Sequence, residues 1–457
     1  MAGADLVVVS NRGPVSFTLD DAGHPVPAGS AGGLAAALAP LLAGSGAVWV
    51  ACAMSEADRA AAALGLVAED GLELRTVQCD PQAYSMAYDV VSNSTLWFMH
   101  HHLFDLSRRP RFDEHWHRAW AAYEELNSHF AEAVSEVAAE GATVLVQDYH
   151  LYLVPGLLAE QRPDLRTVHF SHTPFADPGI LRVLPGDVAR QLLAGMSAGR
   201  SCGFHTDRWE RAYRACCADA GVEPARTFVS ALTPDPELLH RRAAEPACAA
   251  ARRRLDDLLG ERRLVLRVDR IEPSKNLLRG FWALDELFES RPDLRGEVVM
   301  VAHAYNSRQS LADYLAYGNE VEHAAARVNE IWGTGDWEPV VLDVADDTAS
   351  SLAALTRYDV LLVNPLRDGL NLVAKEGPLV NDTDGVVALS REAGAYEELR
   401  QAVVALNPFD VSATAAALAF ALDLDPAERT RRAEALQERV RRRKPGDWLS
   451  DLLAAAG

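Results

Sequence analysis

The lysines of this chain are few, and two of them stand where a phosphate group could be bound. The 457 residues contain three lysines, Lys275, Lys375 and Lys444, against forty-one arginines. Two of the three fall in the runs Arg270-Ile-Glu-Pro-Ser-Lys275 and Asp368-Gly-Leu-Asn-Leu-Val-Ala-Lys-Glu376. A lysine ammonium acts on phosphate as a compact point charge, whereas arginine acts as a planar fork. The pattern predicts phosphate-binding loops at both places.

The second of these runs has the features of a nucleotide-binding turn. A strand is expected before it, a glycine permits a tight turn, and the backbone N–H groups at the start of the following helix form an anion site. A carboxylate about two turns into that helix can accept hydrogen bonds from ribose hydroxyls. An ordinary strand-to-helix turn is the alternative. The predicted donor-binding residues of this run are Asp368, Gly369, Leu370, Asn371, Leu372, Val373 and Glu376.

The first run supplies a pair of cations after the first strand of the second half. Arg270 and Lys275 are five residues apart, with a proline between them. Two cations and a helix N-terminus directed at one diphosphate can neutralise a departing nucleoside diphosphate without a divalent metal. We therefore predict that both residues are catalytic and bind the donor, with neither metal nor cofactor. A solvated charge pair is the alternative.

Polar residues also follow two predicted strands of the first half. Asp148 comes directly after the strand 143–147, and His172 follows the strand 167–170. The carboxyl ends of parallel strands line the ligand crevice of doubly wound folds, so both are candidates for the reacting centre. A structural role is the alternative for the histidine. The aromatic residues Tyr84, Tyr88 and Trp97 belong either to the core or to a carbohydrate-stacking wall, and their spacing leaves both open.

Short β-branched runs alternate with longer helical stretches along the chain, which is the pattern of parallel α/β units. The pattern is interrupted at 233–263, which places a domain boundary near Glu245. We expect two Rossmann-like, doubly wound domains, 1–245 for the acceptor and 246–440 for the nucleotide donor, with a tail at 441–457 that returns to the first. The predicted strands are 6–9, 47–51, 143–147, 167–170, 264–268, 297–301, 340–342, 360–363 and 385–388.

Composition narrows the choice of partners. A formal charge of −21 argues against nucleic acid and against an anionic membrane surface as partners. No apolar run is long enough to span a membrane, and six cysteines without C-x-x-C spacing are typical of cytosolic thiols. We expect a cytoplasmic enzyme whose partners are small molecules. The sequence leaves a homodimer open.

Taken together, the motifs resemble those of the trehalose-6-phosphate synthase family, the retaining glycosyltransferases of family 20, over essentially the whole chain. The resemblance implies a GT-B architecture, in which two Rossmann-like domains face each other across a cleft and the C-terminal one holds the nucleotide. The matching runs are Ser10-Asn-Arg-Gly-Pro14, Ala31-Gly-Gly-Leu34, Tyr88 with Trp97 nine residues later, Asp148-Tyr-His-Leu151, His172-Thr-Pro-Phe175, Arg270 to Lys275, Ser307-Arg308, Ala326-Arg-Val-Asn329, Pro365 to Glu376 and Asn407-Pro-Phe-Asp410.

The resemblance also implies a role for each matching residue. Arg270 and Lys275 would grip the diphosphate, residues 368–373 would surround the donor, and Glu376 would hold the ribose. Asp148 and His172 would lie beside the reacting centre. Gly32 and Gly33 would approach the diphosphate from the N-terminal domain. The implied acceptor-binding residues are Arg12, Tyr88, Trp97, Asp148 and Arg308.

Three departures from the family pattern bear on the substrates. The family motif R-x-D-Y-x-K-G is here Arg270-Ile-Glu-Pro-Ser-Lys-Asn276, its W-x-G-W is Trp49-Val-Ala-Cys52, and Gly377 stands where a tyrosine is usual. This combination is most similar to the validoxylamine-type pseudo-glycosyltransferases of the family, which join two carbasugars through nitrogen.

We therefore predict, from this resemblance, that the chain joins GDP-valienol to validamine 7-phosphate with retention, in antibiotic biosynthesis. A trehalose-6-phosphate synthase that uses a nucleotide glucose and glucose 6-phosphate is the alternative. A non-catalytic, sugar-phosphate-binding regulatory subunit is a third hypothesis.

Overall fold

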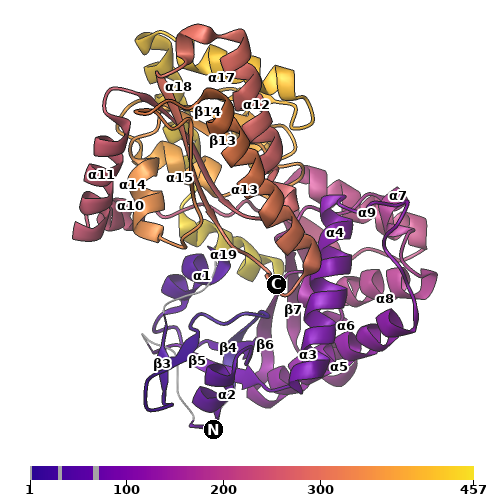
Figure 1. The fold of residues 1–457 in the computed structure, drawn as a ribbon. Coiled ribbons are helices and arrows are strands. Elements are labelled where there is room, and N and C mark those ends of the chain that lie inside the picture. Colours follow the sequence, from indigo (N-terminus) through magenta and orange to yellow (C-terminus); the bar gives the residue numbers. More distant parts are fainter. Residues whose placement is uncertain (1–2, 29–32, 65–70) are drawn as a thin grey trace. The chain divides into compact units, whose positions relative to one another are not determined.

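The computed structural model describes residues 3–28, 33–64 and 71–457. The chain divides into two compact units, one made of Met1–Ala231 with Pro445–Gly457 and the other of Leu232–Lys444 (Figure 1). The division falls before the position near Glu245 that composition indicated. The reason is that helix α10 (Pro236–Ala243) packs on α14 (Thr348–Leu355) and α15 (Val373–Val380) of the second unit.

The first unit is built on a sheet whose seven described strands are all parallel and run in the order β5-β4-β1-β6-β7-β8-β9. Its central strands are almost continuously buried, as expected where helices cover both faces. The strands are β1 (Ala4–Val9), β4 (Val48–Cys52), β5 (Glu73–Val77), β6 (Ala138–Gln147), β7 (Arg166–Ser171), β8 (Ser201–Phe204) and β9 (Arg226–Val229), with a separate hairpin of β2 (Phe17–Leu19) and β3 (Pro25–Pro27).

Helices cover this sheet, and the longest, α5, contributes a stripe of buried aromatic and aliphatic side chains to the core. A π-helical segment, Met86–Leu96, precedes α4 and contacts α5. The helices are α1 (Gly33–Leu42), α2 (Glu56–Ala63), α3 (Pro81–Ser85), α4 (Trp97–His101), α5 (Glu114–Val137), α6 (Val154–Gln161), α7 (Pro178–Leu181), α8 (Gly186–Ser197), α9 (Asp207–Ala220) and α19 (Pro445–Ala455).

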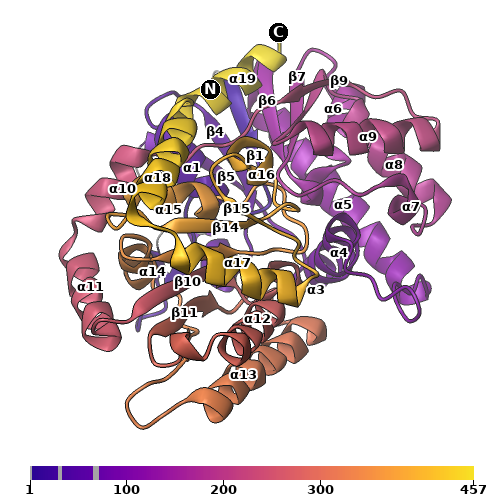
Figure 2. The ribbon, with the colours of Figure 1, turned by 90° about the horizontal axis from the view of Figure 1, so that it is seen from above.

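The C-terminal helix α19 completes the first unit, where it contacts α1 (Figure 2). Trp448 of α19 is fully buried, and its ring lies 5.1 Å from that of Phe170 at the end of β7. Ser201 donates a hydrogen bond to the carbonyl of Ala455 at 2.9 Å. The tail, whose periodicity is weak, is therefore fixed by apolar burial and by contacts with residues far away in the sequence.

The second unit is built on a parallel sheet with the strand order β12-β11-β10-β13-β14-β15, which is the order 3-2-1-4-5-6 of the Rossmann fold. The strands are β10 (Arg263–Arg270), β11 (Val298–Tyr305), β12 (Val340–Asp343), β13 (Val360–Val363), β14 (Val386–Ser390) and β15 (Val404–Leu406). The remaining helices are α11 (Pro246–Leu259), α12 (Leu277–Ser290), α13 (Ala312–Trp332), α16 (Ala395–Leu399), α17 (Val411–Asp423) and α18 (Pro426–Arg441).

The predicted α/β class with two Rossmann-like sheets is confirmed. Every predicted strand is present, although its ends differ by a few residues. The strands that sequence reasoning missed are short or lie towards the sheet edges. For example, β5 has a half-exposed Glu-Leu-Arg-Thr-Val sequence that carries no apolar run. Along the described chain, none of the helices combines the length and the apolar character that crossing a membrane requires.

Candidate active site

In the second unit, the site forms where the order of the strands reverses. Strands β10 and β13 are neighbours, and the connections that follow them run to opposite sides of the sheet, which opens a crevice at their carboxyl ends. The segment after β10 carries Lys275, and the segment after β13 carries Asp368. The two side chains meet there, with Lys275 Nζ 2.5 Å from Asp368 Oδ2. The fold thus joins the two predicted phosphate-binding runs, which are ninety-three residues apart in sequence.

A buried arginine holds the turn that carries Lys275. The guanidinium of Arg267 is fully buried, pairs with Asp269 at 2.9 Å and donates to the carbonyl of Lys275 at 2.9 Å. A Cβ placed on Gly280 would lie 2.0 Å from Arg267 Nη1, so this helix position must be glycine for the arginine to fit. Burial alone would lower the pKa of Lys275, but the carboxylates of Asp368, Asp269 and Glu272 together outweigh it, and the net shift is upward. Lys275 therefore stays cationic.

Glu272 is a buried carboxylate shared by two arginines. Its Oε1 lies 3.2 Å from Arg270 Nη1 and 3.0 Å from Arg308 Nη1, and it also accepts from the Ser307 hydroxyl at 3.0 Å. Arg308 in turn donates to the Tyr314 hydroxyl at 2.7 Å. The structure thus places the cation predicted for the donor beside a cation predicted for the acceptor. The sequence shows Glu272 only as a departure from the family motif and gives no sign of this bridge.

The loop at 368–373 presents backbone amides at the start of α15. Asn371 has a φ of 75°, its side-chain amide donates to Asp368 Oδ2 at 3.2 Å, and its carbonyl oxygen Oδ1 accepts from the amide of Ala374 at 3.2 Å. A Cβ on Gly394 would lie 2.0 Å from the carbonyl oxygen of Gly369, so the neighbouring segment packs directly on this loop. The arrangement fixes amides at a helix N-terminus, which favours an anion.

The last two residues of this run, Lys375 and Glu376, differ in burial and in their contacts. Lys375 is fully buried, with Nζ 2.9 Å from Glu398 Oε2 and 2.9 Å from the carbonyl of Leu232. The prediction that this lysine handles phosphate is therefore wrong, because helix periodicity turns it into the core of the unit. Glu376 is half-buried, and burial raises its pKa to about 7. Its predicted role, to bind the ribose, stays a prediction.

In the first unit, the strand order also reverses, between β1 and β6. Arg12 follows β1 and is exposed, and Asp148 follows β6 with a φ of 68°. Asp148 Oδ1 accepts from the backbone amide of His172 at 3.1 Å. The structure therefore brings together the two residues predicted for the reacting centre.

His172 belongs to a chain of polar side chains at this sheet edge. Its Nδ1 lies 3.1 Å from His205 Nε2 and its Nε2 lies 3.0 Å from Gln147 Oε1. Burial, reinforced by the charge of His205 in its protonated form, holds the pKa of His172 well below its ordinary value. The imidazole is therefore neutral near pH 7 and acts as a hydrogen-bonding group rather than a cation.

The aromatic residues take different positions. Tyr88 lies in the π-helical segment, is half-buried, and stacks between Tyr84 at 5.3 Å and His150 at 5.6 Å. Trp97 stacks on His101 at 3.9 Å, retains 7% exposure and forms part of the core. Tyr88 thus keeps an accessible edge that Trp97 largely lacks. Of the two predicted glycines, Gly32 lies outside the described residues and Gly33 begins α1.

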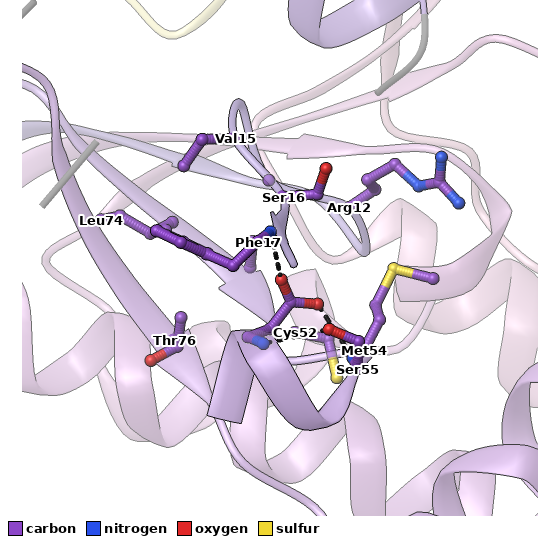
Figure 3. Close-up of a pocket in the computed structure, with 12 residues that line it drawn as sticks. Arg12, Val15, Ser16, Phe17, Cys52, Met54, Ser55, Leu74 and Thr76 are labelled. Atoms are coloured by element: carbon purple, nitrogen blue, oxygen red, sulfur yellow. Dashed lines mark hydrogen bonds between the residues drawn. The ribbon is translucent and has the colours of Figure 1, made fainter. Parts of the chain in front are cut away.

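A pocket of about 230 Å³ lies at the carboxyl ends of β1 and β4. Figure 3 shows its walls, which include Arg12, Phe17, Cys52 and Met54. Asp58 closes one side by accepting from the backbone amides of Phe17 and Ser55. Sequence reasoning identified Arg12 and the substitution at Cys52, but no motif pointed to Met54 or Asp58.

Comparison with known proteins agrees with this geometry. The family model described as glycosyltransferase family 20 matches residues 4–456. The chain belongs to glycosyltransferase family 20. It is accordingly a retaining glycosyltransferase, and the predicted family and the GT-B fold are confirmed.

Several family 20 proteins resemble the chain over almost its whole length. Trehalose-6-phosphate synthase of Mycolicibacterium smegmatis is 32% identical, with 99% of this chain and 93% of that protein covered. The bifunctional trehalose-6-phosphate synthase/phosphatase of Thermoproteus tenax is 30% identical over 98% of this chain, which spans 63% of that longer protein.

Solved structures in the family are similarly close. The α,α-trehalose-phosphate synthase (UDP-forming) of Burkholderia vietnamiensis has a TM-score of 0.87 at 29% identity and covers 100% of this chain and 99% of its own. The Burkholderia xenovorans synthase in complex with glucose-6-phosphate has a TM-score of 0.86 at 27% identity, with 99% of both chains covered. Within residues 3–28, 33–64 and 71–457, no group of three or more histidine, cysteine or acidic side chains could hold a metal ion.

Proposed function

We propose that this family 20 enzyme transfers a glucosyl group from a nucleoside diphosphate glucose to glucose 6-phosphate, with retention, and so makes trehalose 6-phosphate. The observation that carries the proposal is the ion pair of Lys275 with Asp368. This pair brings Lys275 and Arg270 to the same crevice as the backbone amides of the loop 368–373. The synthases that resemble this chain, among them the B. xenovorans enzyme in complex with glucose-6-phosphate, support the choice of substrates. The predicted pseudo-glycosyltransferase activity has no such support.

The residues of the second unit account for departure of the nucleotide. When the bond between the sugar C1 and the phosphate oxygen breaks, its electron pair goes to that oxygen. Arg270, Lys275 and the amides at the start of α15 stabilise the charge that develops on the diphosphate. The ammonium of Lys275 is held by Asp368 before the donor arrives, so little reorganisation is needed. Glu376 accepts from the ribose hydroxyls.

The residues of the first unit bind and orient the acceptor. Arg12 is exposed and can pair with the acceptor's phosphate, while Tyr88 offers an aromatic edge. The carboxylate of Asp148, which is held by the backbone amide of His172, can orient the acceptor hydroxyl. Neutral His172, whose ring nitrogens contact His205 and Gln147, fixes the wall beside it. The oxygen of the attacking hydroxyl forms a bond to C1 on the face that the nucleotide leaves, and its proton passes to the departing phosphate oxygen, so the configuration at C1 is retained. This front-face reaction needs no protein nucleophile.

The pseudo-glycosyltransferase remains a second candidate because Cys52 lines the pocket that also contains Arg12. A cysteine there leaves room that the tryptophan of the family motif would fill. The departure at Gly377 favours neither candidate. A Cβ at this position would lie 2.6 Å from Leu361 Cδ2 and 3.3 Å from the Tyr358 ring, so the residue faces the core of the unit.

Product analysis separates the candidates. The purified protein is incubated with UDP-, GDP- or ADP-glucose and glucose 6-phosphate, and in parallel with GDP-valienol and validamine 7-phosphate. We expect release of nucleoside diphosphate with a glucose donor and a phosphorylated disaccharide whose NMR spectrum shows an α,α-1,1 linkage. Turnover confined to the cyclitol pair would establish the second candidate. Binding of nucleotide without turnover of any donor would show a non-catalytic protein.

A further inference from the structure

A separate pocket lies in the second unit, away from the donor crevice. Its volume is about 520 Å³, which is enough for a small metabolite. It lies among the neighbouring helices α10, α11, α14, α15 and α18 (Figure 2). Two of the residues that line it, Thr356 and Asp382, precede β13 and β14, so the pocket is at the amino-terminal edge of the sheet. The predicted donor residues lie at the opposite edge, at the carboxyl ends of β10 and β13.

The lining of this pocket combines buried apolar groups with exposed basic groups. The side chains of Leu379 and Val380 are buried, whereas His240 and Arg441 are exposed. Gln437 lies one turn before Arg441 on α18, so the two side chains share a helix face. Among the described residues, no hydrogen bond or ion pair is formed by either of these two side chains. Both are therefore available to a ligand.

The charge of the lining is positive on balance. Arg252 on α11 is held in place, since its Nη1 donates to the Thr356 hydroxyl at 2.6 Å and lies 3.3 Å from Asp382 Oδ2. Asp382 is the one acidic residue among the described residues that line the pocket, and Arg252 neutralises it. His240 Nδ1 lies 2.6 Å from the carbonyl oxygen of Pro236, so its Nε2 can take up a proton beside an anion. The arginine of α18 is therefore the surplus charge, which suits the pocket to an anion.

Helix α15 joins this pocket to the donor loop. The helix begins directly after the loop 368–373, and Leu379 and Val380 at its other end line the pocket. At about 1.5 Å of rise per residue, its 8 residues span about 12 Å. Helix α10, which packs on α15, also lines the pocket. Burial raises the pKa of Glu376 on α15, and the charge of Arg242 on α10 opposes that rise. A ligand in the pocket therefore contacts two helices that also form the surroundings of the predicted donor residues.

We propose that this pocket is a second ligand site, which binds a small phosphorylated polyol such as a sugar phosphate and thereby strengthens nucleotide binding at the donor crevice. The phosphate pairs with Arg441 and protonated His240. Hydroxyl groups bond to Gln437 and Asp382, and the carbon skeleton lies on Leu379. A ligand fixed against α15 limits the movement of this helix, so less order remains for the nucleotide to impose. The inference rests on the proposed function only for the place where the nucleotide binds.

Calorimetric titration of the full-length protein with sorbitol 6-phosphate tests the site without reference to turnover. We expect sorbitol 6-phosphate to bind, and sorbitol, which lacks the anion, to bind about 10-fold more weakly or less. Arg441→Ala should weaken binding of sorbitol 6-phosphate by about 10-fold. Arg253→Ala, which removes an exposed arginine of α11 outside the pocket, is the matched control, and thermal melting checks the fold of both variants. Absence of binding, equal affinity for sorbitol and its phosphate, or equal affinity of the two variants would overturn the proposal.

Nucleotide titration tests the coupling. UDP and GDP are titrated with and without saturating sorbitol 6-phosphate. We expect the Kd of the nucleotide that binds to fall about 5-fold, and the effect to disappear in Arg441→Ala. Hydrogen exchange at 373–380 should slow when sorbitol 6-phosphate alone is bound. An unchanged or higher nucleotide Kd with the probe bound would contradict the coupling. A protein that bound both ligands in this way but turned over no glucose donor would refute the proposed function and leave the second site standing.

Discussion

At the scale of single residues, the proposed donor site depends on which charged side chains lie in the crevice of the second unit. Lys275 forms an ion pair with Asp368 in the crevice. Lys375 lies in the second predicted phosphate-binding run, but its ammonium forms a buried ion pair with Glu398. Lysine is rare in this chain and both runs contain one, but the two lysines differ in burial, since Lys375 is fully buried. Residue type alone therefore does not separate a lysine that lies in a crevice from one that is buried in the core.

Replacement of Lys275 tests its role in the departure of the nucleotide. Lys275→Ala should lower kcat by about 10²- to 10³-fold, on the scale of a lost electrostatic donor, because the charge on the leaving diphosphate loses a partner. Lys275→Arg should recover part of the rate, since it keeps the charge in a different geometry. Initial rates of nucleotide release check this, and thermal melting controls for folding. A fully active alanine variant would exclude the lysine from the reaction.

Glu272 offers a test of the shared carboxylate. Glu272→Gln keeps the shape of the side chain but removes a negative charge between Arg270 and Arg308. We expect the melting temperature to fall, because a buried ion pair loses a partner, while affinity for inorganic pyrophosphate rises several-fold. Calorimetric titration measures the second effect. Weaker pyrophosphate binding would instead mean that Glu272 positions the arginines.

Because the pKa of Glu376 is raised, we expect donor binding to depend on pH. Its pKa is raised to about 7 by burial, so about half of the free protein carries a protonated Glu376 at that pH. A ribose hydroxyl donates more strongly to the carboxylate than to the neutral acid, so the KM for the donor should fall as pH rises from 6 to 8. In Glu376→Gln this dependence should disappear. A donor KM that varied identically with pH in both proteins would assign the titration to another group.

At the scale of elements, the position of the loop 368–373 depends on its packing against the segment that contains Gly394 and Ala395. The carbonyl of Gly369 packs against Gly394, and the amide of Ala395 donates to the carbonyl of Leu370 at 2.7 Å. Gly394→Ala would push one backbone segment off the other, and a shift of about 1 Å at a positioned group can cost about 100-fold in rate. We expect weaker nucleotide binding and a lower kcat. Gly446→Ala, whose added Cβ meets nothing within 4 Å, is the matched control. Equal effects in the two variants would contradict this account.

The elements also show what the sequence could reveal. The sequence predicts strands such as 264–268 and 360–363 because buried parallel strands are almost wholly apolar. The residues that follow such strands are then expected at a ligand crevice. The sequence does not identify Arg267 as the support of the Lys275 turn, since its partner carbonyls and the space at Gly280 are set by tertiary packing. The bridge from Glu272 to Arg308 spans thirty-six residues, and no local pattern encodes it.

At the scale of the whole molecule, the two units each contain a parallel sheet whose strand order reverses, but they carry different side chains at the reversal. Each sheet reverses its strand order next to its first strand, and predicted site residues end or follow the strands at each reversal, Arg12 and Asp148 in the first unit and Arg270, Lys275 and Asp368 in the second. The second unit supplies cations and helix amides suited to a diphosphate. The first supplies neutral histidine, carboxylate and aromatic groups suited to a sugar.

The most direct test is a crystal structure of the protein soaked with UDP or GDP. The account predicts that both phosphorus atoms lie against Arg270 and Lys275, with phosphate oxygens within hydrogen-bonding distance of the amides at 370–373 and the ribose on Glu376. A nucleotide whose phosphates bind away from these groups, with Lys275 still paired only to Asp368, would contradict it.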